Sequence, residues 1–233
     1  MNGNILFRQT LQHLAQKRRS EAQSKPASRL PWDDEILGTY KEKWLAYFKM
    51  LDTTKDITFP RATTPLDIDR NIRPDLITLS DGNEDAFGAV AYSRWTLNNG
   101  SKEDRLIAAK AKLGPFMDKG EVVKMELSSA AMAARLKSWI LKNTRCDYGT
   151  YYPFLDSRIV QHMIRKESYS LNTFAGLRVK EITAKSDVSA WLHISSKDNY
   201  VADILTRGST PEKLGEKSEW QRGPTWLYDD IEL

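Results

Sequence analysis

The chain has 233 residues and a mass of 26.7 kDa, which is enough for one good-sized domain or for one domain with appended segments. Its 40% apolar and 28% charged residues exclude a fibrous or wholly disordered protein, and its single cysteine, Cys146, excludes a disulfide framework or a cysteine-based zinc finger. The excess of 35 Lys and Arg over 31 Asp and Glu gives a net charge of +4, which mildly favours a polyanionic partner.

The first 29 residues are polar and basic, with a cluster of cations at Lys17–Arg19. A short helix is expected over Leu6–Leu14, but no sustained apolar face follows it, so we predict a flexible extension over residues 1–29. The start of the chain lacks the basic-then-apolar pattern of a secretion signal, which favours an intracellular protein. No apolar stretch is long enough to cross a bilayer, so no membrane partner is expected.

A different pattern occupies residues 30–74. Asp33–Asp34 is a candidate cap for a helix over Leu37–Leu51, whose apolar residues recur at steps of three and four. The three prolines that follow, within residues 57–75, favour an extended connector over a second compact domain.

From Asp75 onward the sequence alternates between strand and helix patterns. The predicted elements are strands over 76–79, 87–97 and 105–113, a helix over 126–141, a strand over 151–155, helices over 158–165 and 172–184, a strand over 190–195 and a helix over 200–207. This order predicts an α/β fold in which helices flank a mixed five-stranded sheet. We expect it to span residues 75–208, with residues 209–233 as a C-terminal tail.

Four acidic residues fall where such a sheet would gather them. Asp81 and Asp156 end two predicted strands, and Glu126 and Asp203 lie in two predicted helices, at positions that would line one shared crevice. Four acids at one place repel each other strongly unless cations lie between them, and hard divalent cations suit oxygen ligands best. The chain has 31 acidic residues, so some of them fall at strand and helix ends by chance. Any one of these four could instead cap a helix or lie in a solvated turn.

Several stretches in this region have the order and spacing of one known family. They are Ser80–Tyr92, Lys124–Ala130, Leu155–Ser157, Trp191–Ile194, Asn199–Gly208 and Gly223–Leu227. On these stretches the chain resembles the ribonuclease H domain of LTR-retroelement reverse transcriptases, in particular those of the BEL/Pao group. Residues 30–60 are similar to the connection segment that joins polymerase to ribonuclease H in that group, which assigns residues 30–74 as connection.

The resemblance implies a ribonuclease H-like fold and a metal-dependent endonuclease. It identifies the four acids as ligands of two Mg²⁺ ions, for which Mn²⁺ could substitute. The implied substrate is the RNA strand of an RNA–DNA hybrid, cut to leave a 5′-phosphate and a 3′-hydroxyl. The implied partner is the polymerase domain of the same polyprotein, and the implied location is the cytoplasm, in a virus-like particle, or the nucleus.

Five residues beside the acids are candidates for contacting nucleic acid. Backbone groups at Gly82, Asn83 and Ser157 could sense the 2′-hydroxyl that distinguishes RNA. Lys124 and Arg158 are close enough in sequence to the acids to hold phosphates. A role as solvated surface cations fits these last two equally well.

Other functions are also considered. Many cellular ribonucleases H have a mobile histidine after the last strand, but residues 195–199 contain none, and His193 lies inside the strand. The tip of this region is short, so weak intrinsic affinity for the hybrid is expected. The chain could instead be a non-catalytic connection or scaffold fragment, although four intact acids argue against decay, or a DNA nuclease of the same fold. A serine hydrolase is disfavoured because no Gly-x-Ser-x-Gly motif is present.

Overall fold

The computed structural model describes residues 5–12, 14, 36, 38–115, 121–166, 168–228 and 231. The chain forms two compact units, Met1–Asp56 and Ile57–Leu233, each of which is described by itself. Within the described residues, no helix is both long enough and apolar enough to span a membrane.

The first unit contains the helix α2, Thr39–Asp52, which begins after Gly38. Residues 5–12 are also helical, and Thr10 accepts a 3.0 Å hydrogen bond from the indole N–H of Trp44. Leu6 and Thr10 are buried, so this part of the predicted extension has a packed face that its sequence pattern did not reveal. The predicted cap Asp33–Asp34 lies outside the described residues.

The second unit is built on a five-stranded sheet in the order β3-β2-β1-β4-β5. Its strands are β1 (Asp75–Gly82), β2 (Ala86–Thr96), β3 (Lys102–Leu113), β4 (Tyr151–Leu155) and β5 (Leu192–His193). The first three are antiparallel neighbours, whereas β4 runs parallel to both β1 and β5. The prediction of a mixed five-stranded sheet is therefore confirmed.

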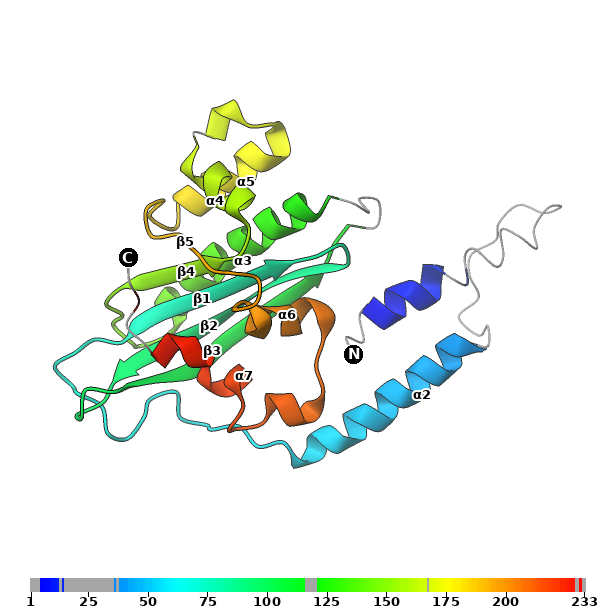
Figure 1. Cartoon of the computed structure of the whole chain (residues 1–233), viewed down its shortest axis with the longest axis horizontal. Coiled ribbons are helices and arrows are strands. Elements are labelled where there is room, and N and C mark those ends of the chain that lie inside the picture. The colour runs from blue at the N-terminus through cyan, green and yellow to red at the C-terminus, as the bar shows by residue number, and fades with distance from the viewer. Residues whose placement is uncertain are drawn as a thin grey trace. The chain divides into compact units, whose positions relative to one another are not determined.

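Helices cover both faces of this sheet (Figure 1). They are α3 (Val122–Asn143), α4 (Arg158–Arg165), α5 (Thr173–Thr183), α6 (Tyr200–Arg207) and the short α7 (Glu219–Arg222). The first three share one core cluster and α6 belongs to another. Residues of β1 alternate between the two clusters, with Leu76 facing α3 and with Ile77 and Leu79 in the cluster of α6, as the period-two geometry of a strand requires.

The helix α3 packs closely on the sheet because its inner face is made of small residues. Ala130, Ala131 and Ala134 are all fully buried, as their spacing in the sequence predicted. The strand β5 is shorter than the predicted 190–195. Trp191 instead lies in the core, where its indole N–H donates a 3.0 Å hydrogen bond to Ser186 Oγ.

Segments on both sides of residues 75–208 pack on the sheet. Before it, Thr63 O accepts a 3.0 Å hydrogen bond from the Trp95 indole, and Ile68 forms an isolated bridge to Leu97. After it, the Tyr92 hydroxyl donates a 2.9 Å hydrogen bond to Trp220 O. Leu227 is fully buried in the cluster of α6. The compact unit thus includes residues before and after the predicted domain of residues 75–208.

Ending the chain after Gly208 should destabilise the second unit by about 3–6 kcal/mol, because it removes a buried leucine and two half-buried tryptophans at roughly 1.5–3 kcal/mol per large side chain. Thermal or urea unfolding measures this change. The point variant Leu227→Ala should lower the stability by about 2–5 kcal/mol. Leu177→Ala is the matched control, since Leu177 is 62% exposed. Equal stability of the truncated and full chains would contradict the packing described here.

Candidate functional site

Asp81 lies at the end of β1 on the face that α6 covers. It follows Ile77 and Leu79 at the same two-residue spacing and is only 6% exposed. Its carboxylate accepts a hydrogen bond from the hydroxyl of Thr206, which is fully buried in α6. Alternation along the strand therefore directs this acid into a largely dry environment.

Glu126 lies near the start of α3, against the end of β1. A Cβ added to Gly82 would fall 2.5 Å from the backbone nitrogen of Glu126, so only glycine permits this close approach of strand and helix. Glu126 accepts a 2.6 Å hydrogen bond from Ser157 Oγ. Ser157 also caps α4 by accepting a hydrogen bond from the backbone N–H of Val160.

Asp156 follows the last residue of β4 and is half-buried. The parallel register pairs Ser80 of β1 with Leu155 of β4, so Asp81 and Asp156 are the next residues on two adjacent strands that end together. Parallel strands that end side by side place the residues after them in one crevice.

Asp203 lies in the first turn of α6, where the helix N-terminus favours a negative charge. Its Oδ2 is 3.3 Å from Nε of Arg207, one turn later in the same helix. Asn199, just before α6, donates a 3.0 Å hydrogen bond from its amide to Ser80 O. This bond ties the start of α6 to the end of β1.

The four acids form one electrostatic group with Asp156 at its centre. Burial raises the pKa of Asp81 to about 6; the Thr206 hydrogen bond opposes this, and Asp203 and Asp156 add to it. Burial also raises the pKa values of Glu126 and Asp203, and repulsion from Asp156 raises both further. The structure therefore places Asp156 near enough to act on each of the other three predicted acids, and like-charge repulsion among them is incompletely compensated.

The predicted nucleic-acid contacts have other visible partners. Gly82 is buried under α3, and Asn83 Oδ1 accepts 2.9 Å hydrogen bonds from two backbone N–H groups, those of Asp85 and Ala86, in the turn between β1 and β2. Lys124 pairs with Glu121 and lies over a ring, 5.6 Å from the centroid of Phe174. Arg158 is exposed at the start of α4. Their binding to nucleic acid stays a prediction.

Sequence reasoning missed the direct partners of the acids. Thr206 and Arg207 each contact a carboxylate, yet no role was predicted for either of them. The spacing of four residues between Asp203 and Arg207 was an available signal, since side chains at that spacing meet on a helix. The contact between Thr206 and Asp81 joins two distant segments and left no local signal.

The donor set suits a hard divalent cation, because all four side chains offer carboxylate oxygens. In the part of the chain that the structure describes, no three Asp, Glu, His or Cys side chains converge closely enough to hold a metal as they stand. Three of the acids are instead turned toward Thr206, Ser157 and Arg207. Small rotations away from these partners would be needed for joint coordination.

The family described as the Pao retrotransposon-like RNaseH-like domain matches residues 9–157, more than half of the chain. The chain belongs to this family. The matched range includes Asp81, Glu126 and Asp156 but ends before Asp203. A search of curated proteins finds no match.

The chain is also similar to solved structures of two ribonucleases H and of a reverse transcriptase. LC11-RNase H1 in complex with an RNA/DNA hybrid is 14% identical, with 60% of this chain and all of that one covered and a TM-score of 0.40. RNase H1 of Halobacterium salinarum is 13% identical, with 59% and 97% covered and a TM-score of 0.35. The foamy viral protease-reverse transcriptase with RNA/DNA hybrid is 14% identical, with 85% and 32% covered and a TM-score of 0.38. The description of the matching family gives this domain as RNaseH-like.

Asp81→Asn should stabilise the metal-free protein at neutral pH. The unfolded carboxyl titrates near pH 3.9 and the folded one near 6, so ionisation of Asp81 lowers the free energy of unfolding as the pH rises between these values. The substituted asparagine cannot ionise, so the free energy of unfolding of the variant should exceed that of the wild type by up to about 3 kcal/mol above pH 6. Below pH 4, where Asp81 is protonated in the folded protein, this difference should vanish. Thermal melts in a chelator across pH 4–8 measure the difference. Asp147→Asn is the control, with a side chain 80% exposed, and an equal effect there would contradict the explanation.

Gly82→Ala should destabilise the fold and displace the start of α3. The added methyl group meets backbone atoms of Met125 and Glu126, which cannot rotate away as a side chain could. We expect a loss of about 1–3 kcal/mol, typical of overpacking. Chemical denaturation measures it, and Gly215→Ala is the control, because a Cβ there meets nothing closer than 3.9 Å and its φ is negative.

Proposed function

We propose that this domain cleaves the RNA strand of RNA–DNA hybrids by metal-dependent phosphodiester hydrolysis. The observation that carries the proposal is the group of four acids, in which burial raises the pKa values of Asp81, Glu126 and Asp203 and repulsion from Asp156 adds to each shift. Incompletely compensated negative charge at the ends of adjacent strands favours binding of divalent cations. Membership of the Pao retrotransposon-like family supports this choice of chemistry over other metal-dependent reactions.

Each acid would serve as a ligand for magnesium, or for manganese in its place. Two bound ions would activate a water and stabilise the leaving oxygen of the phosphodiester. The Thr206 and Ser157 hydroxyls, which donate hydrogen bonds to Asp81 and Glu126 in this structure, would yield these carboxylates to the ions. Asp203 would bind a metal ion only after the Arg207 side chain moves away from it. Arg207 is exposed, so its side chain has room to move.

Selection of RNA would depend on groups at the rim of the acid group. Ser157 and the turn at Gly82–Asn83 flank the acids closely enough to sense a 2′-hydroxyl across the minor groove. Lys124 and Arg158 would bind phosphates on either side. We further propose that the polymerase domain of the same polyprotein supplies most of the affinity for the hybrid, within an intracellular virus-like particle.

A cleavage assay tests the proposal directly. The purified full chain is incubated with a hybrid labelled on the RNA strand, with magnesium, with manganese and with chelator, and an all-DNA duplex of the same sequence is run in parallel. RNA cleavage that needs the metal supports the proposal. Metal-dependent cleavage of the all-DNA duplex would favour a DNA nuclease of the same fold. No cleavage, even when the polymerase domain is added, would favour the scaffold alternative.

Asp156→Asn should reduce cleavage by about 100-fold or more while the protein stays folded. The substitution keeps the volume of the side chain but removes the charge that couples to the other three acids. Loss of about 2.7 kcal/mol of transition-state stabilisation corresponds to this factor. Initial rates at saturating magnesium measure it, with circular dichroism to check the fold. Asp147→Asn is the matched control on the surface, and full activity of Asp156→Asn would remove Asp156 from the site.

A further inference from the structure

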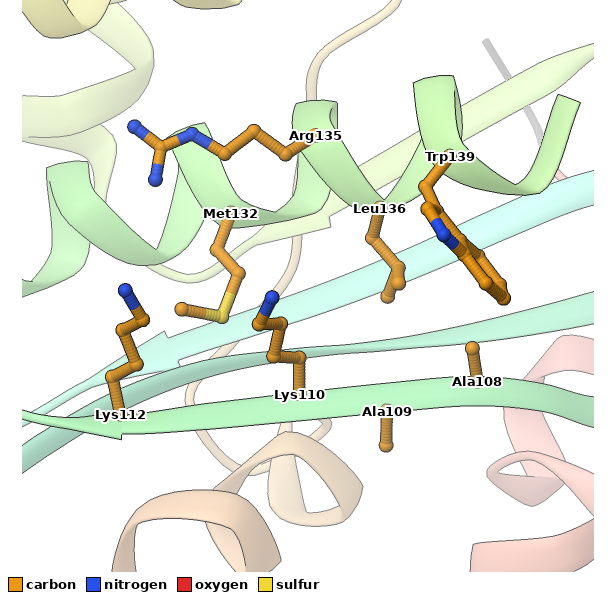
Figure 2. A pocket seen from close by; sticks show the side chains of 8 residues that line it. All are labelled: Ala108, Ala109, Lys110, Lys112, Met132, Arg135, Leu136 and Trp139. Carbon is orange, nitrogen blue, oxygen red and sulfur yellow. The ribbon is translucent and has the colours of Figure 1, made fainter. Parts of the chain in front are cut away.

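A groove separate from the acid group lies between the edge strand β3 and the later turns of α3 (Figure 2). Its volume is about 440 Å³, which lies within the range of small-ligand pockets. None of the four acids lines it. The lining residues are Ala108, Ala109, Lys110, Lys112, Met132, Arg135, Leu136 and Trp139.

The charged residues that line the groove are all cationic. Lys110 and Lys112 are exposed on β3, and within the described residues neither forms an ion pair. Arg135 donates two 2.5 Å hydrogen bonds to Glu181. Glu181 is shared with two more cations within 4.0 Å, on Arg178 and Lys185. The described residues that line the groove therefore keep a positive surplus even after the pairing of Arg135 with Glu181 is counted.

The other end of the groove is aromatic. Trp139 stands over Ala108, and its side chain is 56% exposed although it belongs to a helix whose inner face is buried (Figure 2). Met132 and Leu136 form a buried apolar floor between this ring and the lysines. The β3 side chain that points toward the ring in Figure 2 is the small methyl group of Ala108.

Lysines on an edge strand have a structural explanation, because they prevent pairing with a strand of another chain. That explanation fits Lys110 and Lys112 taken alone. It does not account for an exposed tryptophan on the neighbouring helix, or for a third cation, Arg135, among the residues that line the groove (Figure 2). A positively charged groove with an exposed aromatic ring is the arrangement that binds single strands, since every base has a stackable face.

We propose that this groove binds a single-stranded segment of nucleic acid. One base stacks on the Trp139 ring, and the adjoining phosphates lie against the ammonium groups of Lys110 and Lys112. Stacking and phosphate contacts require no particular sequence, so binding is tolerant of base identity. The proposal does not depend on the cleavage reaction, because the groove contains none of the acids.

The test is binding of a fluorescent single strand of about ten nucleotides, within the site sizes known for such grooves, to the full chain in chelator. Trp139→Ala should weaken binding by about 5- to 100-fold, and Trp139→Phe should restore most of the affinity. Lys110→Gln with Lys112→Gln should reduce the slope of log K against log salt by about 1.4, or roughly 0.7 for each phosphate that a lysine no longer neutralises.

The controls carry the same chemical changes elsewhere on the surface. Tyr169→Ala removes an aromatic side chain that is 83% exposed, and Lys213→Gln with Lys217→Gln removes two exposed charges. Unchanged affinity of Trp139→Ala, or an equal loss in the controls, would overturn the proposal. Displacement of the strand by an oligoglutamate peptide at matched charge would also overturn it, in favour of an acidic protein partner. Loss of cleavage by Asp156→Asn with strand binding intact would separate this groove from the proposed active site.

Discussion

The close approach of Gly82 to the start of α3 is the contact on which the geometry of the acid group depends. It places the end of β1 against the backbone of Glu126, where a Cβ would fall 2.5 Å away. The end of β1, which carries Asp81, and the start of α3, which carries Glu126, are thereby fixed against each other by their backbones. The hydrogen bond from Asn199 to Ser80 O brings α6 to the same strand end. Backbone packing, rather than attraction between side chains, gathers groups that repel each other.

This arrangement sets stability against function. Burial and mutual repulsion raise the pKa of Asp81 to about 6, so the ionised protein retains charge that the fold does not neutralise. The hydroxyls of Thr206 and Ser157 and the guanidinium of Arg207 relieve part of it. None of the three neutralises the group fully, because two are neutral donors and the third is exposed. A site that binds cations needs such residual charge, and the alanine-rich packing of α3 supplies the stability that offsets it.

The sheet and the acids were predictable from sequence because their signals are local. Period-two patterns and turn residues marked the strands, and the small face of Ala130, Ala131 and Ala134 marked the packed side of α3. The failures concern distant contacts. Trp191 was predicted to lie in a strand, but its side chain fills the core. The strand β5 comprises only Leu192–His193. The bond from Thr206 to Asp81 spans 125 positions. The groove at Trp139 also needed β3 and α3 to be placed together.

The helix α3 links the acid group with the groove. Glu126 and Trp139 lie on this one helix and are separated by about 20 Å at 1.5 Å per residue. Because the helix is buried along its alanine face and continuous from Val122 to Asn143, this separation is fixed rather than adjustable. A strand held at Trp139 would therefore meet the acids at a constant distance along the nucleic acid. The domain would then measure position on its substrate by the length of a helix, with no need to read the sequence.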